Sequence, residues 1–220
     1  SSWGWQAELR LADIDFKQEK YSEAITAFRA WLRYHPTQPQ AAYARFMIAK
    51  CYFSQIPTDS IVTPAAYERD LSGATDAEEA LERFVRDNPS SEYVVEAREL
   101  LRRTRDTLAR AEIAVAEFYA SRQQYTAAIA RLRVVLETYR GSGREPEALL
   151  RVGETYLTMN RREDARDAFS GVLRSYADST YATAARRYLA FLGPAPAGAA
   201  PSAAPSAASA APSAAASAAN

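Results

Sequence analysis

The sequence of 220 residues predicts an all-α fold, an α-solenoid of helix–turn–helix repeats with one long helix shared between two repeats, followed by a disordered tail. Three observations support this prediction. Apolar residues recur at helical spacing, an alanine-centred pattern occurs four times, and no glycine or proline interrupts residues 91–122. Hydrophobic residues make up 48% of the chain, which provides material for a core.

Residues 21–34 show the repeated pattern most clearly. Apolar side chains at the i, i+3, i+4 and i+7 positions form one helix face, made of Tyr21, Ala24, Ile25, Phe28, Trp31 and Leu32. His35 and Pro36 end this helix, because the residue before a proline avoids helical backbone. The same pattern precedes residues 88–89, 139–140 and 176–177.

The register of the repeats rests on alanines. Each repeat has one in its first helix, namely Ala24, Ala77, Ala128 and Ala165. Twelve residues later the chain reaches a turn, and eight residues further it reaches a second alanine, namely Ala44, Ala97, Ala148 and Ala185. These second alanines begin a small-residue face where two helices approach closely. The pattern resembles the tetratricopeptide repeat, whose period is about 34 residues.

The steps between repeats are 53, 51 and 37 residues, so two repeats carry insertions. We expect the first insertion, residues 54–74, to form a loop with a short helix around residues 65–71. The second, residues 91–122, predicts one helix about 45 Å long at 1.5 Å per residue, which joins two repeats rigidly. Residues 1–192 are therefore the predicted repeat domain, and residues 193–220 are an Ala/Pro/Ser-rich tail without a charge to anchor it.

Composition argues against several functions. The 27 basic and 27 acidic residues balance, which disfavours nucleic-acid binding, and no stretch is apolar enough to span a membrane. Cys51 is the single cysteine, and we expect a buried, inert thiol rather than a reactive one. His35 is the single histidine, and we expect a role in the turn rather than as a ligand.

Carboxylate pairs are the remaining candidates for chemistry. Glu78 with Glu79 and Glu96 with Glu99 could act as paired acids, but arginines lie nearby on exposed helix faces, so we expect solvated ion pairs. No phosphate-binding glycine loop or metal-spaced cluster is present. The sequence therefore predicts a binding protein that is not an enzyme and holds no cofactor or metal.

Residues 112–144 carry the candidate binding site. Arg122 closes the long helix, where a cation suits the free carbonyls, and Arg131 and Arg133 lie in the next helix. One interpretation is helix-end electrostatics with solvated arginines. The other is a protein-docking site, because arginine is enriched in interfaces and pairs bidentately with carboxylates.

The order of motifs resembles the BamD family of outer-membrane assembly lipoproteins over about residues 3–176. The residues that carry the resemblance are His35, Pro36, Thr37, Gln38, Pro39, Tyr43, Asn88, Pro89, Ser90, Ser91, Glu92, Tyr93, Leu108, Ala109, Glu112, Val115, Ala116, Glu117, Tyr119, Arg122, Tyr125 and Arg131. The insertion at residues 54–74 also falls where this family has one.

The resemblance implies a non-catalytic subunit of the machine that inserts β-barrel proteins, at the periplasmic face of the bacterial outer membrane. Its C-terminal repeats are expected to bind the last periplasmic domain of BamA through Glu117, Tyr119, Arg122, Arg131 and Arg133. Its N-terminal repeats are expected to receive unfolded barrel substrates, and other assembly lipoproteins are possible partners. Membrane attachment is expected only through a lipid anchor that this chain lacks.

Two other functions remain open from the sequence. A generic periplasmic tetratricopeptide scaffold, such as a coordinator of the Tol–Pal system, would share the repeats but not the insertion or the long helix. A repeat domain of a peptidoglycan hydrolase would require a catalytic region outside these 220 residues.

Overall fold

The computed structural model describes residues 2–57 and 71–194, and these residues form α-helices joined by turns, with no strand among them. The helices are α1 (Ser2–Lys17), α2 (Tyr21–Tyr34), α3 (Ala41–Ser54), α4 (Ser72–Asp87), α5 (Val94–Ser121), α6 (Tyr125–Glu137), α7 (Glu145–Thr158), α8 (Arg162–Ser175) and α9 (Thr180–Leu192). The predicted all-α fold is confirmed. The short helix expected around residues 65–71 and the tail lie outside the described residues, apart from Leu71 and residues 193–194.

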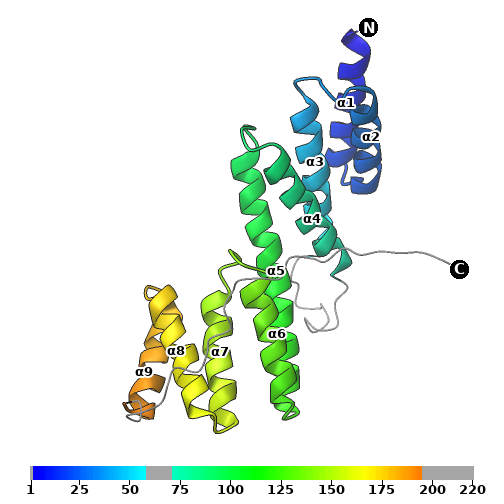
Figure 1. Cartoon of the computed structure of the whole chain (residues 1–220). Coiled ribbons are helices and arrows are strands. Elements are labelled where there is room, and N and C mark those ends of the chain that lie inside the picture. The colour runs from blue at the N-terminus through cyan, green and yellow to red at the C-terminus, as the bar shows by residue number, and fades with distance from the viewer. Residues whose placement is uncertain (1, 58–70, 195–220) are drawn as a thin grey trace, which may run out of the picture.

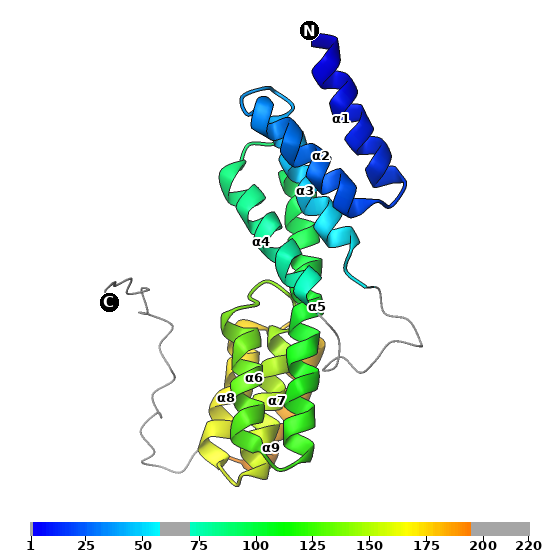
Figure 2. The same cartoon turned by 90° about the vertical axis from the view of Figure 1, so that its right-hand side faces the viewer.

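Each helix packs against the next one along the chain, so the molecule is a stack of helical hairpins. The predicted long helix is confirmed as α5, which has 28 residues. Figures 1 and 2 show α5 running through both halves of the molecule, with α3 and α4 beside its first half, α1 and α2 beyond them, and α6–α9 toward its second half. We call these halves the N-terminal lobe (α1–α4 and the start of α5) and the C-terminal lobe (the end of α5 and α6–α9).

The register alanines lie where the sequence predicted close helix contacts. The first set, Ala24, Ala77, Ala128 and Ala165, is at most 1% exposed, and the second set, Ala44, Ala97, Ala148 and Ala185, is fully buried. A methyl group is small enough to let neighbouring backbones approach. A larger side chain at these positions would push two helices apart.

Three of the turns between successive helices share a feature that the sequence did not reveal. Glu19, Gln123 and Asn160 have φ values of 60°, 62° and 60°. After each one, the next backbone N–H donates to a carbonyl five residues earlier, for example Gln124 N–H to Tyr119 O at 2.9 Å. This left-handed closure satisfies carbonyls at the helix end and reverses the chain tightly into the next helix.

Two separate hydrophobic cores meet on α5. Ala97 and Leu100 belong to the core of the N-terminal lobe, whereas Ala109 and Ile113 belong to that of the C-terminal lobe. Between them the buried hydroxyl of Thr104 donates to Leu100 O at 2.9 Å. The two cores are therefore separated on α5 by a polar belt, formed by Thr104 and the neighbouring Arg105.

Arg105 lies in this belt and corrects one expectation. Its guanidinium contacts Glu78, at 2.9 Å, and Glu82 on α4, and it also donates to Arg140 O at 3.1 Å. The Glu78 side chain is only 15% exposed, so the expected solvated pair was wrong for this residue. The reason is tertiary, because α4 packs directly against α5 and brings an acid beside a base.

The other carboxylates confirm the expectation of exposed ion pairs. Glu79 pairs with Arg83, Glu96 with Lys50 and Glu99 with Arg102, and at least half of each of these carboxylate side chains is exposed.

Cys51 and His35 also have the expected structural roles. The Cys51 side chain is fully buried, and this burial raises the pKa of its thiol to about 12, which makes it inert at neutral pH. The His35 N–H donates to Trp31 O at 2.9 Å and closes α2, while its ring packs 5.2 Å from the Trp31 ring.

Candidate functional site

The candidate site is the hairpin formed by the end of α5 and the start of α6. Arg122 follows the last residue of α5, as predicted, and its guanidinium lies 4.1 Å from the centroid of the Phe118 ring. Gln123, with its positive φ, then turns the chain into α6. The hairpin tip is thus fixed by backbone hydrogen bonds and a cation–π contact.

Arg131 is presented on the outer side of α6. Its Nη1 lies 3.4 Å from Oε2 of Glu112 on α5, and the arginine side chain is 45% exposed. A guanidinium has five N–H donors, and this long contact engages few of them. The remaining donors can bind a carboxylate from another protein.

The structure does not bring all five predicted residues together. Arg133 is exposed but lies two residues from Arg131, and residues with this spacing do not face each other on a helix. Tyr119 is partly buried and packs against the core of the C-terminal lobe. Its ring therefore supports the hairpin from within, and Arg133 belongs to another part of the surface.

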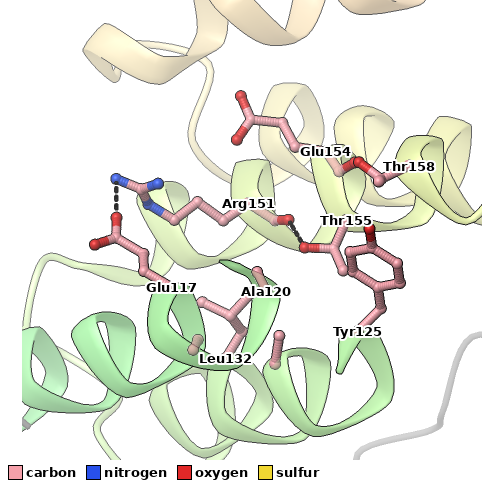
Figure 3. A pocket seen from close by; sticks show the side chains of 10 residues that line it. Glu117, Ala120, Tyr125, Leu132, Arg151, Glu154, Thr155 and Thr158 are labelled. Atoms are coloured by element: carbon pink, nitrogen blue, oxygen red, sulfur yellow. Dashed lines mark hydrogen bonds and ion pairs between the residues drawn. The ribbon is translucent and has the colours of Figure 1, made fainter. Parts of the chain in front are cut away.

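Glu117 takes part in a contact that the sequence analysis missed. It pairs with Arg151 of α7 at 2.8 Å, and Figure 3 shows the two side chains reaching toward each other from separate helices. A groove of about 180 Å³ lies beside this pair. Its lining residues are Ala116, Glu117, Ala120, Tyr125, Ala128, Leu132, Arg151, Glu154, Thr155 and Thr158.

A line of alternating charges continues from this pair along α5 and α7. Arg151 also contacts Glu147 at 3.3 Å, Glu147 contacts Arg144 at 3.1 Å, and Arg144 reaches Asp106 of α5 at 2.6 Å. The hydrogen bond from Arg144 to Asp106 raises the pKa of the arginine. The i, i+4 spacing of Glu147 and Arg151 was the signal in the sequence, but their contacts with α5 depend on how the hairpins stack.

The site offers charges and a groove rather than a reactive group. Among the described residues, no three His, Cys, Asp or Glu side chains cluster as metal ligands would, and no helix in that part of the chain is long and apolar enough to cross a membrane. Cys51, the single thiol, is buried in the other lobe. The fold and this surface define a helical-repeat protein.

Residues 1–170 match the model of the YfiO family, which is described as an outer membrane lipoprotein. The chain belongs to this family, which confirms the resemblance seen in the sequence. Proteins of this family are outer membrane lipoproteins that face the periplasm, which is the expected location.

Similar proteins come from several bacteria and share the name outer membrane protein assembly factor BamD. The protein of Caulobacter vibrioides is 32% identical over 166 residues, which are 76% of this chain and 52% of that protein. That of Rickettsia prowazekii is 25% identical, covering 83% of this chain and 69% of its own length. The protein of Neisseria gonorrhoeae is 24% identical, and the match covers 74% of this chain and 61% of that protein. The chain thus spans from about half to about two thirds of the length of these relatives.

Proposed function

We propose that this protein is a non-catalytic subunit of the complex that assembles β-barrel proteins in the bacterial outer membrane. The observation that carries the proposal is the family match over residues 1–170, together with relatives that are named assembly factors. A stack of helical hairpins supports it, because such a stack presents an extended surface to other proteins.

The first proposed partner is the last periplasmic domain of BamA, bound at the α5–α6 hairpin. Arg131 supports this role because it is 45% exposed and has only a long contact with Glu112. Arg122, at the tip of the same hairpin, adds a second exposed cation. A carboxylate of the partner would receive two parallel N–H bonds from a guanidinium, which gives both affinity and orientation.

The second proposed partner is an unfolded barrel substrate, bound at the N-terminal lobe. An open hollow of about 400 Å³ lies on α2 and is lined by Ser22, Glu23, Thr26, Ala27 and Ala30. Tyr34, near the end of the same helix, is 72% exposed. Small and aromatic side chains on one helix can receive the alternating side chains of an extended peptide.

Calorimetric titration of this chain with the purified periplasmic region of the cognate BamA tests the first partner. We expect saturable binding, and Arg131→Glu should weaken it about thirtyfold or more, because losing one member of an interfacial charge pair costs about 2 kcal/mol or more. Arg187→Glu on α9, another exposed arginine, is the matched control and should bind like the wild type.

Circular dichroism decides how a loss of binding is understood. If the folded, monomeric wild type does not bind, the assembly role is wrong and a scaffold with other partners remains. If Arg131→Glu loses helicity, Arg131 has a structural role instead.

A peptide with the sequence of the last strand of a barrel protein tests the second partner. All three tryptophans of the chain lie within residues 3–31, so binding at the N-terminal lobe should change tryptophan fluorescence. Tyr34→Ala should reduce the affinity, whereas Tyr176→Ala in the C-terminal lobe should not. Equal affinities of both variants would contradict binding at α2.

A further inference from the structure

The groove beside Glu117 exists because α5 and α7 do not pack closely. Of the corresponding helix pairs, α3 with α5 and α7 with α9 pack against each other, whereas α1 with α3, like α5 with α7, does not pack closely. At the α5–α7 seam, long side chains bridge the space instead, through Glu117 with Arg151 and Asp106 with Arg144. The gap between α5 and α7 is thus bridged by ion pairs, and small residues line the groove beneath them.

The size of the groove indicates what it can hold. Its floor is apolar and is formed mainly by Ala116, Ala120, Ala128 and Leu132. A volume of about 180 Å³ is well below the ~300 Å³ at which small-molecule pockets begin. Cavities of about 150 Å³ hold one benzene ring, so this groove suits a single aromatic side chain.

The charge at the rim indicates what should flank that side chain. Glu117 and Glu154 are the acidic residues of the lining, and Arg151 is its basic residue. Arg151 is already shared between Glu117 at 2.8 Å and Glu147 at 3.3 Å. Glu154 accepts a hydrogen bond from Tyr188 at 3.0 Å, and no cation of residues 2–57 or 71–194 contacts its carboxylate. The rim therefore has an excess of negative charge.

We propose that this groove is a docking site for a partner protein that inserts one aromatic side chain and pairs a neighbouring lysine or arginine with Glu154. The site is separate from the Arg131 surface, because Glu112 and Glu117 are five residues apart and lie about 140° apart around the helix. It does not rest on the function proposed above. The occupant is defined by its chemistry, an aromatic residue beside a basic one.

The test is an NMR titration of the whole chain, with its alanine methyl groups labelled, using capped tripeptides as probes. Arg-Phe-Arg should shift the methyl signals of Ala116, Ala120 and Ala128 in a saturable way. Arg-Ala-Arg lacks the ring and Glu-Phe-Glu reverses the charge, so each should bind more weakly. The proposal is overturned if Arg-Phe-Arg leaves these three signals unmoved at its solubility limit, or if Glu-Phe-Glu binds equally well.

Two pairs of variants locate the binding. Ala120→Leu should fill the groove and abolish the shifts, whereas Ala130→Leu, on the exposed side of α6, should not. Glu154→Gln retains an acceptor for Tyr188 and should weaken binding by about threefold to fivefold, the range of a partly exposed ion pair. Glu137→Gln removes the same charge from an exposed position and should have no effect. Unchanged affinity in Glu154→Gln contradicts the proposed ion pair even if Ala120→Leu does not fold.

Discussion

The two lobes are built from the same repeat but are packed differently. In the N-terminal lobe, aromatic rings fill the space between helices, as Phe46 does by stacking 5.2 Å from Tyr93 and tilting against Phe84 at 5.6 Å. In the C-terminal lobe, Gly153 and Gly171 are buried, and Phe169 stacks on Tyr188 at 4.6 Å.

The difference extends to the surface. The line of ion pairs from Asp106 to Glu117 belongs to the C-terminal lobe, where α5 and α7 are bridged rather than packed. Aromatic rings fill the space between helices of the N-terminal lobe. In the C-terminal lobe, buried glycines allow some helices to approach closely, while other helices lie further apart. The groove beside Glu117 therefore lies in the C-terminal lobe, at the place where two helices are bridged by ion pairs.

The largest expected effect comes from removing a ring of the N-terminal lobe. Phe28 is fully buried, so Phe28→Ala should lower the free energy of unfolding by about 3–5 kcal/mol. Urea unfolding followed by tryptophan fluorescence reports this lobe, and circular dichroism reports both. The fluorescence midpoint should fall further than the dichroism midpoint. An equal fall would show that the lobes unfold as one unit.

Overpacking the C-terminal lobe should have the next largest effect. A Cβ on Gly153 would lie 2.7 Å from Cδ1 of Phe169, so Gly153→Ala should destabilise the protein by about 1–3 kcal/mol. Gly73→Ala on α4 is the matched control, because a Cβ there would have no side chain of residues 2–57 or 71–194 within 4 Å. The control should stabilise the protein slightly, since alanine favours helix over glycine. Thermal melting of both variants measures the contrast, and equal shifts would contradict it.

Arg105 joins the lobes, so its loss should separate their transitions. Arg105→Met leaves Glu78 without its cation and should cost about 1–3 kcal/mol, as for a partly buried acid that loses its partner. Arg102→Met breaks an exposed pair with Glu99 and should cost less than about 0.5 kcal/mol. Fluorescence and dichroism midpoints should differ more in Arg105→Met than in the wild type. Coincident midpoints would show that α5 alone couples the lobes.

The smallest expected effect is a pH dependence of the N-terminal lobe. The folded state raises the pKa of the Cys51 thiol from 9.0 to about 12 through burial. Its contribution to stability is thus complete below pH 9 and falls as the pH rises toward 12. Between pH 8 and pH 10 the melting temperature seen by tryptophan fluorescence should fall more in the wild type than in Cys51→Ala. Parallel curves would show that the thiol does not titrate differently on unfolding.

Much of the fold could be predicted because it depends on local pattern. The spacing of Ala24, Ala44 and their counterparts placed the hairpins, and the stretch without glycine or proline placed α5. The left-handed turns at Glu19, Gln123 and Asn160 escaped notice because none of these residues is glycine. The left-handed conformation of these residues follows from closure of the preceding helix, and it cannot be predicted from their residue types.

The candidate site was predictable only in part. Arg122 and Arg131 lie on the surface as expected, but Arg151 was missed and Tyr119 packs inward. Whether a helical residue meets a partner from another hairpin depends on the distance and angle between helices, which the sequence of one helix does not encode. Glu78 shows the same limit, since its partner Arg105 lies 27 residues away.

The sequence by itself determined the all-α repeat, its register, the long helix and the family, because helix periodicity and close alanine contacts act over a few turns. Tertiary structure alone decided that two cores meet on α5, that Arg105 ties the lobes together and that the α5–α7 seam stays open. These features arise where side chains from distant helices compete for the same space and the same charges. That competition is resolved only when the hairpins stack.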